Sequence, residues 1–142
     1  MKVHAYLNLP GNAAEAFELY RSVFGGDLSS HVRFRDMPME GVDVPEADQD
    51  KAMHIALPIG EDDMLMASDA LESLGQTLAS GNNVYISVHP DTREDADRIF
   101  NGLSAGGEVE MPIADQVWGD YYGACTDRFG VQWMVNHSSQ HA

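Results

Sequence analysis

Hydrophobic and polar positions follow the same order twice along this chain. From Leu7 to Leu9 they alternate as in a strand, and after the turn at Pro10-Gly11 they take the 3.6-residue spacing of a helix. The segment from Ile86 to Val88 alternates in the same way and leads, after His89-Pro90, into a second helical pattern. Each helix has one apolar stripe, so we expect each to pack on a sheet. The stripes consist of Ala13, Ala16, Phe17, Tyr20 and Phe24 in the first helix, and of Ala96, Ile99, Phe100 and Leu103 in the second.

Both predicted helices begin with a polar residue and end at a glycine pair. Each has a residue type that commonly caps a helix, with a Glu three positions later. These pairs are Asn12 with Glu15, and Asp91 with Glu94. Glycines at 25–26 and 106–107 end the helices, because glycine adopts the left-handed conformation that closes a helix.

Three segments with strand character follow each helix, so each half predicts a βαβββ module. The segments are 28–35, 52–59 and 64–67 in the first half, and 109–113, 120–126 and 131–136 in the second. We expect an α+β fold with one domain, 1–142, in which the first module is 1–70 and the second is 80–139. The two modules should form a curved, mixed eight-stranded sheet around a cleft, with the helices on the outer face. Residues 36–50 are acidic and contain proline, and we expect them to form a covering loop.

Alternation within the strands predicts which side chains line the cleft, because successive side chains point to opposite faces. One set of alternate residues, Val3 and Val84 included, should pack on the helices. The other set is expected to line a ligand-binding pocket, although it could equally be the solvated side of an open antiparallel sheet. The expected pocket residues from the strands are His4, Tyr6, Asn8, His54, Met64, Met66, Ser68, Asn83, Tyr85, Gln132 and Met134.

Trp118 is the remaining candidate pocket residue. With Tyr121 and Tyr122 nearby it is able to form an aromatic cage for an organic or cationic ligand, and it is equally able to close the edge of the sheet. Met64 and Met66 also have two possible roles, because methionine side chains either line a pocket and adapt to the ligand or fill space in the core.

Composition narrows the possible partners. The 142 residues hold 23 Asp and Glu against 8 Lys and Arg, and the formal charge of −15 disfavours nucleic acid and anionic membrane surfaces. Such a charge is typical of a solvated surface, of adaptation to salt, or of a preference for cationic ligands. Cys125 is the single cysteine, so no intramolecular disulfide forms and a reducing, cytoplasmic location is expected. We expect its thiol to be buried and inert.

Six segments of the chain carry a family resemblance, namely 6–13, 20–26, 53–57, 66–69, 118–123 and 127–136. Together they resemble the PhnB-like branch of the vicinal oxygen chelate superfamily, which includes glyoxalase I, extradiol dioxygenases and bleomycin resistance proteins. The resemblance covers essentially the whole chain. It implies a homodimer that binds a small organic molecule.

The resemblance also implies where a metal would bind, because catalytic members hold a divalent ion through His and Glu on the first and last strand of each module. Three of those positions fall here on Met66, Asn83 and Met134. The first-strand position falls on His4 if the Pro10-Gly11 turn is one residue longer than in glyoxalase I, and on Ala5 without that shift. Thioether and amide groups are poor ligands for such ions, so no metal of the usual kind and no cofactor are expected.

Other constellations of the same residues are weaker hypotheses. His4, His54 and Asp69 could converge on a metal, and Ser68 with Asp69 and His54 supplies the ingredients of an activated nucleophile. For His4 and His54, a hydrogen-bonded pocket or core role is favoured over catalysis. His137 and His141 are expected to lie in a polar tail without a role.

The leading hypothesis is therefore a small-molecule-binding protein without the superfamily's usual metal, whose catalytic activity is open. One alternative is a metal-dependent lyase or transferase resembling glyoxalase I and using His4. The other is non-enzymatic sequestration of a cationic drug, which the acidic composition favours.

Overall fold

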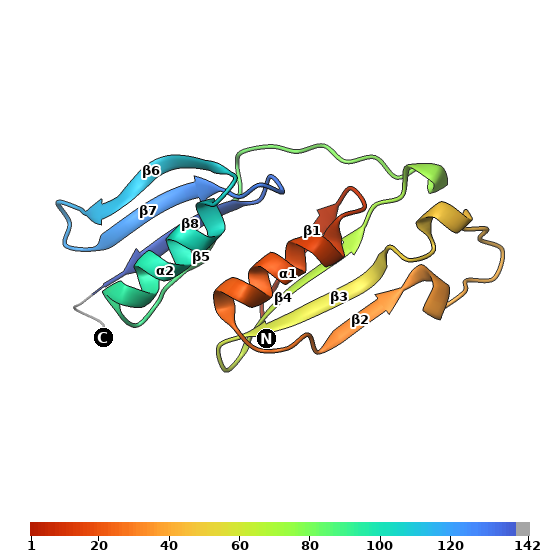
Figure 1. The fold of residues 1–142 in the computed structure, drawn as a ribbon, viewed down its shortest axis with the longest axis horizontal. Helices are drawn as coiled ribbons and strands as arrows, with labels where there is room; N and C mark the ends of the chain where they lie inside the picture. Colours follow the sequence, from red (N-terminus) through yellow and green to blue (C-terminus); the bar gives the residue numbers. More distant parts are fainter. Residues whose placement is uncertain (139–142) are drawn as a thin grey trace. The chain divides into compact units, whose positions relative to one another are not determined.

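The chain divides into two compact units, Met1–Ala79 and Ser80–Ala142, and the computed structural model describes residues 1–138 (Figure 1). Within the described part, each unit holds a four-stranded mixed sheet and a 12-residue α-helix. The expected α+β fold with two βαβββ modules is confirmed. Hydrogen bonding defines two separate four-stranded sheets, since the first and last strand of each module pair with each other. Residue 139, the expected end of the second module, and His141 lie outside the described residues.

The first unit has the strand order β1-β4-β3-β2, in which β1 and β4 are parallel and the other neighbours are antiparallel. The predicted strand at 28–35 is shorter than expected, because the chain leaves it for a short 3-10 turn at Phe34–Asp36. The elements are β1 (Ala5–Leu9), α1 (Ala13–Phe24), β2 (Ser30–Arg33), β3 (Ala52–Ile59) and β4 (Asp63–Asp69).

Helix α1 packs on this sheet through most of the stripe that the sequence predicts, except that Val23 is buried and Phe24 is only half-buried. Phe17 and Tyr20 are fully buried, and their rings meet edge to face with centroids 5.4 Å apart. Ala13 and Ala16 are also fully buried, and their small side chains let the helix approach the strands closely. Removing the Phe17 ring would cost about 3–5 kcal/mol of stability.

Asn12 is the N-cap residue of α1, as predicted, but its side chain makes no capping hydrogen bond. The backbone amides of Gly11 and Ala13 donate instead to Oδ1 of Asp69, at 3.1 and 3.0 Å. Oδ2 of the same carboxylate accepts from the amide of Ala52 at 2.8 Å. Asp69, at the end of β4, thereby joins the start of the helix to the start of β3.

The second unit repeats the topology with the order β5-β8-β7-β6, and β5 runs parallel to β8. The first strand is shorter than expected and begins only at Ile86. Val84 was expected to pack on the helix but is 72% exposed, because it precedes the paired residues; Val3, before β1, is 86% exposed for the same reason. The elements are β5 (Ile86–Val88), α2 (Arg93–Ser104), β6 (Glu108–Asp115), β7 (Tyr121–Thr126) and β8 (Gln132–His137).

Helix α2 begins one residue later than predicted. Thr92, and not Asp91, is the N-cap, and its Oγ1 accepts a hydrogen bond from the amide of Asp95 at 3.0 Å. The predicted stripe is buried against the sheet, where Phe100 lies over Gly123 of β7. A Cβ at Gly123 would lie 2.8 Å from the Phe100 ring, so only glycine fits beneath the ring without a shift. Among residues 1–138, no helix has the length and apolar character needed to cross a membrane.

Candidate functional site

The face of the first sheet that lies opposite α1 carries most of the predicted pocket residues of this unit. In β1, Leu9 is buried while Tyr6 and Asn8 are exposed. In β4, Leu65 and Ala67 are buried, and the alternate residues are half-buried. We call this side the first polar face, which comprises Tyr6, Asn8, His54, Met64, Met66 and Ser68.

Tyr6 and His54 form the most organised contact on the first polar face. Their rings are stacked, with centroids 5.7 Å apart and planes 28° apart. The Tyr6 hydroxyl is also in hydrogen-bond contact with Nδ1 of His54 at 3.1 Å. Tyr6 is 47% exposed, so this pair presents an aromatic surface with polar edges to solvent.

Short polar contacts continue across the same face. Ser68 donates a hydrogen bond to Oδ1 of Asn8 at 3.4 Å, between the parallel strands β4 and β1. The Ser29 hydroxyl contacts the sulfur of Met64 at 3.8 Å. His4, also predicted to lie here, precedes the first residue of β1 and is exposed.

The second sheet has a corresponding face opposite α2. Cys125 and Trp133 are paired across β7 and β8 and are fully buried, so the neighbouring pair of Thr126 and Gln132 points to the opposite side. Met134 lies two residues further along β8 and is half-buried. Asn83 and Tyr85 belong to the segment before β5, where Asn83 is exposed and Tyr85 is half-buried.

Glu110 joins this side of the second sheet and was not singled out from the sequence. Its Oε1 accepts a hydrogen bond from the Thr126 hydroxyl at 2.6 Å, and its Oε2 accepts one from the Tyr85 hydroxyl. Both donors lower the pKa of the Glu110 carboxyl, and Thr126 has the larger effect. The bond to Glu110 raises the pKa of Tyr85. We call Tyr85, Glu110, Thr126 and Gln132 the Glu110 cluster.

Trp118 lies in the turn between β6 and β7 and is 57% exposed. Its ring meets Tyr122 edge to face, with centroids 6.1 Å apart. Tyr121 does not join them, because its hydroxyl donates to Asp97 of α2 and the Arg93 guanidinium lies 3.9 Å from its ring centroid. Of the aromatic cage considered above, the structure brings together only Trp118 and Tyr122.

The residues at the superfamily's usual metal positions do not fit a metal ion. Met66 and Met134 offer thioethers, Asn83 offers an amide, and His4 lies outside β1. Asp69 cannot complete a set with His4 and His54, since it is 4% exposed and both its oxygens accept backbone hydrogen bonds. Over the whole described chain, no three His, Cys, Asp or Glu side chains are grouped so as to hold a metal ion.

Cys125 is buried, as expected. Burial is the main cause that raises the pKa of its thiol, to about 11, and the nearby negative charges of Asp127 and Glu110 act in the same direction. Because the thiolate is the reactive form, this cysteine is a poor nucleophile at neutral pH.

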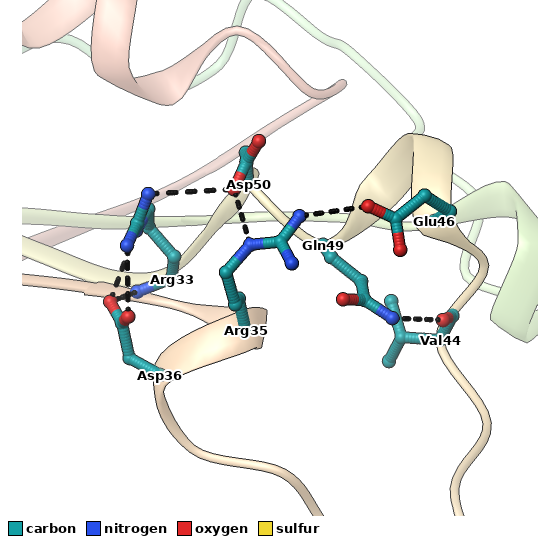
Figure 2. A network of polar contacts seen from close by, with 7 residues as sticks. All are labelled: Arg33, Arg35, Asp36, Val44, Glu46, Gln49 and Asp50. Carbon is teal, nitrogen blue, oxygen red and sulfur yellow. Dashed lines mark hydrogen bonds and ion pairs between the residues drawn. The ribbon is translucent and has the colours of Figure 1, made fainter.

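The acidic segment 36–50 is tied to β2 by a network of ion pairs (Figure 2). Arg33 contacts Asp36 at 3.1 Å and Asp50 at 3.4 Å. Arg35 contacts Asp50 at 2.8 Å and Glu46 at 3.1 Å. The hydrogen bonds to the two arginines lower the pKa values of Asp36 and Asp50.

Two cavities lie beside this segment in the first unit. One, of about 220 Å³, is lined largely by apolar side chains of the segment, among them Met37, Met39 and Val42. The other, of about 530 Å³, lies beside Lys51 and Asp48, which are ion-paired at 2.7 Å. Neither cavity includes a residue of the first polar face.

His137 is the position at which the sequence interpretation fails most clearly. It was expected in a polar tail, yet it is the last residue of β8 and is 8% exposed. Its Nδ1 is in hydrogen-bond contact with the Pro90 carbonyl at 3.0 Å. Strand β8 continues one residue beyond the predicted end at position 136. A cavity of about 250 Å³ lies at this end of the strand, beside Asp91 and Asp120.

Comparison with known proteins assigns the fold to a family. The model of the Glyoxalase/Bleomycin resistance protein/Dioxygenase superfamily matches residues 3–135. This chain belongs to that superfamily. The family resemblance drawn from the sequence is therefore confirmed.

Relatives cover almost the entire chain. The protein YjdN of Escherichia coli is 32% identical over an alignment of 143 positions, which covers 96% of this chain and 95% of YjdN. The crystal structure of PA1353 from Pseudomonas aeruginosa is 37% identical, with a TM-score of 0.85 and coverage of 97% of this chain and 98% of PA1353. The PhnB protein of Bacillus cereus shares the fold, at 22% identity, a TM-score of 0.76 and coverage of 97% and 100%.

Proposed function

We propose that this protein binds a small organic molecule on the polar faces of its sheets, without the divalent metal usual in the superfamily. The stacked and hydrogen-bonded pair of Tyr6 and His54 carries the proposal. Aromatic side chains next to a few oriented polar groups are the usual lining of a small-molecule site. The residues proposed to contact the ligand are the twelve pocket residues predicted from the sequence.

The surroundings of the Tyr6–His54 pair support this role. Met66 lies opposite Tyr6 across the strand pair, and Ser68 lies opposite Asn8. Flexible thioethers adapt to irregular ligand shapes, whereas the hydroxyl and amide groups fix orientation through hydrogen bonds. The same mixture would be unremarkable on a solvated surface, so the ring stack and its hydrogen bond distinguish this face.

Native mass spectrometry of the full chain, purified without an affinity tag or chelator, tests the proposal directly. We expect a co-purified organic compound that adds to the mass of the native protein and is released on denaturation. His54→Ala should lower its occupancy at least about tenfold, because the stack and the hydrogen bond are both lost. His31→Ala is the matched control, since His31 is an exposed histidine of the same sheet. Equal occupancy in the two variants would contradict the proposal.

Metal analysis of the same preparation tests the alternative of a metal-dependent lyase or transferase resembling glyoxalase I. We expect no stoichiometric divalent ion, because the donor set at the four usual positions does not suit one. One tightly bound ion per chain would favour the alternative. If the His4→Ala variant no longer bound the ion, His4 would be identified as one of its ligands.

We further propose that the protein is a homodimer. In each sheet the two outer strands are paired on one side only, so their other edges carry unpaired backbone groups. The outer strand β6 also exposes Val109 and Met111, at 45% and 42%. Light scattering after gel filtration should give twice the mass of the chain, 15.6 kDa, and a monomer mass at micromolar concentration would contradict this proposal.

A further inference from the structure

A β-bulge positions the Glu110 carboxylate. Val109 pairs with Cys125, and Met111 pairs with Ala124. The two partners on β7 are adjacent, whereas Glu110 separates the two residues on β6, so Glu110 is the extra residue of the bulge. A bulge turns the side chain of the extra residue away from the regular alternation of the strand. Here the carboxylate is turned to Tyr85 and Thr126, which hold one oxygen each.

Within residues 1–138, the charge of Glu110 has no basic partner. Among the described residues, its carboxylate forms no ion pair with Lys, Arg or His, and its pKa is lowered by neutral hydroxyl groups alone. By contrast, the carboxylates of Asp36, Asp50 and Asp115 are held by arginines. The Glu110 cluster therefore keeps a fixed, ionised and uncompensated carboxylate at neutral pH.

Gln132 adds a hydrogen-bond donor to the cluster. The residue is 7% exposed, and its buried Nε2 has no hydrogen-bond partner that meets normal geometry among the described residues. It lies close enough to the Tyr85 hydroxyl to oppose the rise in the pKa of Tyr85. A buried amide with an unused N–H is costly, and an acceptor atom of the ligand, separate from any cationic group, would recover that cost.

We propose that the Glu110 cluster binds the ammonium or guanidinium group of an organic cation, with Glu110 as the anionic contact. This inference deepens the proposed function, on which it rests, by naming the charge of the ligand. A cationic N–H donor matches the free lone pairs of a carboxylate, and such charge-assisted hydrogen bonds are about twice as strong as neutral ones. The net charge of −15 raises the local concentration of cations around the whole protein.

Two probes of nearly the same shape distinguish binding of a cation at Glu110 from the general attraction of cations to the acidic protein. The full-length, isotope-labelled protein would be titrated with 2-phenylethylamine and with 2-phenylethanol, and backbone amide shifts would be followed at Glu110, Thr126 and Gln132. We expect the amine to bind at least about tenfold more tightly than the alcohol. Glu110→Gln should abolish this preference while leaving the weaker binding of the alcohol unchanged.

Glu108→Gln is the matched control, because Glu108 is exposed on the same strand and the substitution removes the same charge. It should retain the preference for the amine. An equal loss in the two variants would assign the effect to overall charge and overturn the inference. Equal affinities of the amine and the alcohol for the unsubstituted protein would overturn it as well.

The inference and the proposed function fail in distinguishable ways. Alcohol binding without an amine preference would overturn the role of Glu110 and leave the proposed function intact. If neither probe shifts the three amides, the inference is wrong, and the native mass spectrometry described above decides the proposed function separately. Melting temperatures of both variants within about 2 °C of the unsubstituted protein would establish that the comparison is between folded proteins.

Discussion

The indole Nε1 of Trp133 donates a hydrogen bond to Oδ2 of Asp127 at 2.9 Å. The other oxygen of Asp127 accepts from the backbone amides of Phe129 and Val131, at 2.8 and 3.0 Å. Asp127 therefore fixes both the turn between β7 and β8 and the largest side chain of the core. Trp133 is fully buried and Asp127 is 3% exposed, so the contact is shielded from water.

Trp133→Phe should destabilise the protein by about 2–4 kcal/mol, because it removes both buried indole surface and the donor to Asp127. Urea unfolding followed by circular dichroism measures this loss. Trp118→Phe is the control, since Trp118 is more than half exposed, and it should change stability by less than about 0.5 kcal/mol. Similar losses in both variants would contradict the role of the Asp127–Trp133 bond.

Asp69→Asn should cost about 2–3 kcal/mol of stability. Three backbone amides, from two separate elements, converge on this carboxylate, and an amide side chain would turn an N–H group toward at least one of them. Hydrogen exchange should rise first at Gly11, Ala13 and Ala52. Asp43→Asn, in the exposed loop, is the control and should leave both stability and exchange unchanged.

The segment 36–50 should loosen in acid. The folded-state pKa values of Asp36 and Asp50 lie below the ordinary value of 3.8, so the protonated forms are disfavoured in the folded protein. The stabilisation is fully present above that value and is lost as the pH falls below it, through the lowered pKa values. Hydrogen exchange across the segment should therefore be unchanged from pH 7 to about pH 5 and should rise, relative to the intrinsic rate, below pH 4.

Salt and substitution test the same network independently. Because the ion pairs are exposed, 1 M NaCl should accelerate proteolysis of the segment at neutral pH. Arg35→Ala should do so as well. Arg21→Ala, which removes exposed ion pairs from α1 instead, should not. Resistance of the segment in the Arg35 variant would show that its order does not depend on these pairs.

Cys125 should resist alkylation in the native protein. With a pKa of about 11, only about one thiol in a thousand is ionised at pH 8, and the side chain is fully buried. Iodoacetamide should modify it rapidly in urea and only at the rate of unfolding in buffer. Rapid modification of the folded protein, measured by mass spectrometry, would contradict both the burial and the raised pKa.

Local patterns in the sequence predict most of the elements and most of the core. The stripe of Phe17 and Tyr20 and the alternation of Leu65 and Ala67 specify which face of each element is buried, since both follow from periods of 3.6 and 2 residues. The strand at Ala52–Ile59 was predicted with the same bounds. The duplicated order of the elements is also visible in the sequence, and with it the family.

Contacts between residues far apart in the chain were decided only by the tertiary structure. Asn12 occupies the cap position but its side chain makes no capping hydrogen bond, and Asp69 of β4 accepts from the amides of Gly11 and Ala13 at the start of the helix. Glu110 depends on a bulge whose register no local period encodes, and His137 depends on a carbonyl 47 residues away. Periodicity fixes the side of an element on which a residue lies, whereas its hydrogen-bond partners depend on how strands align after folding.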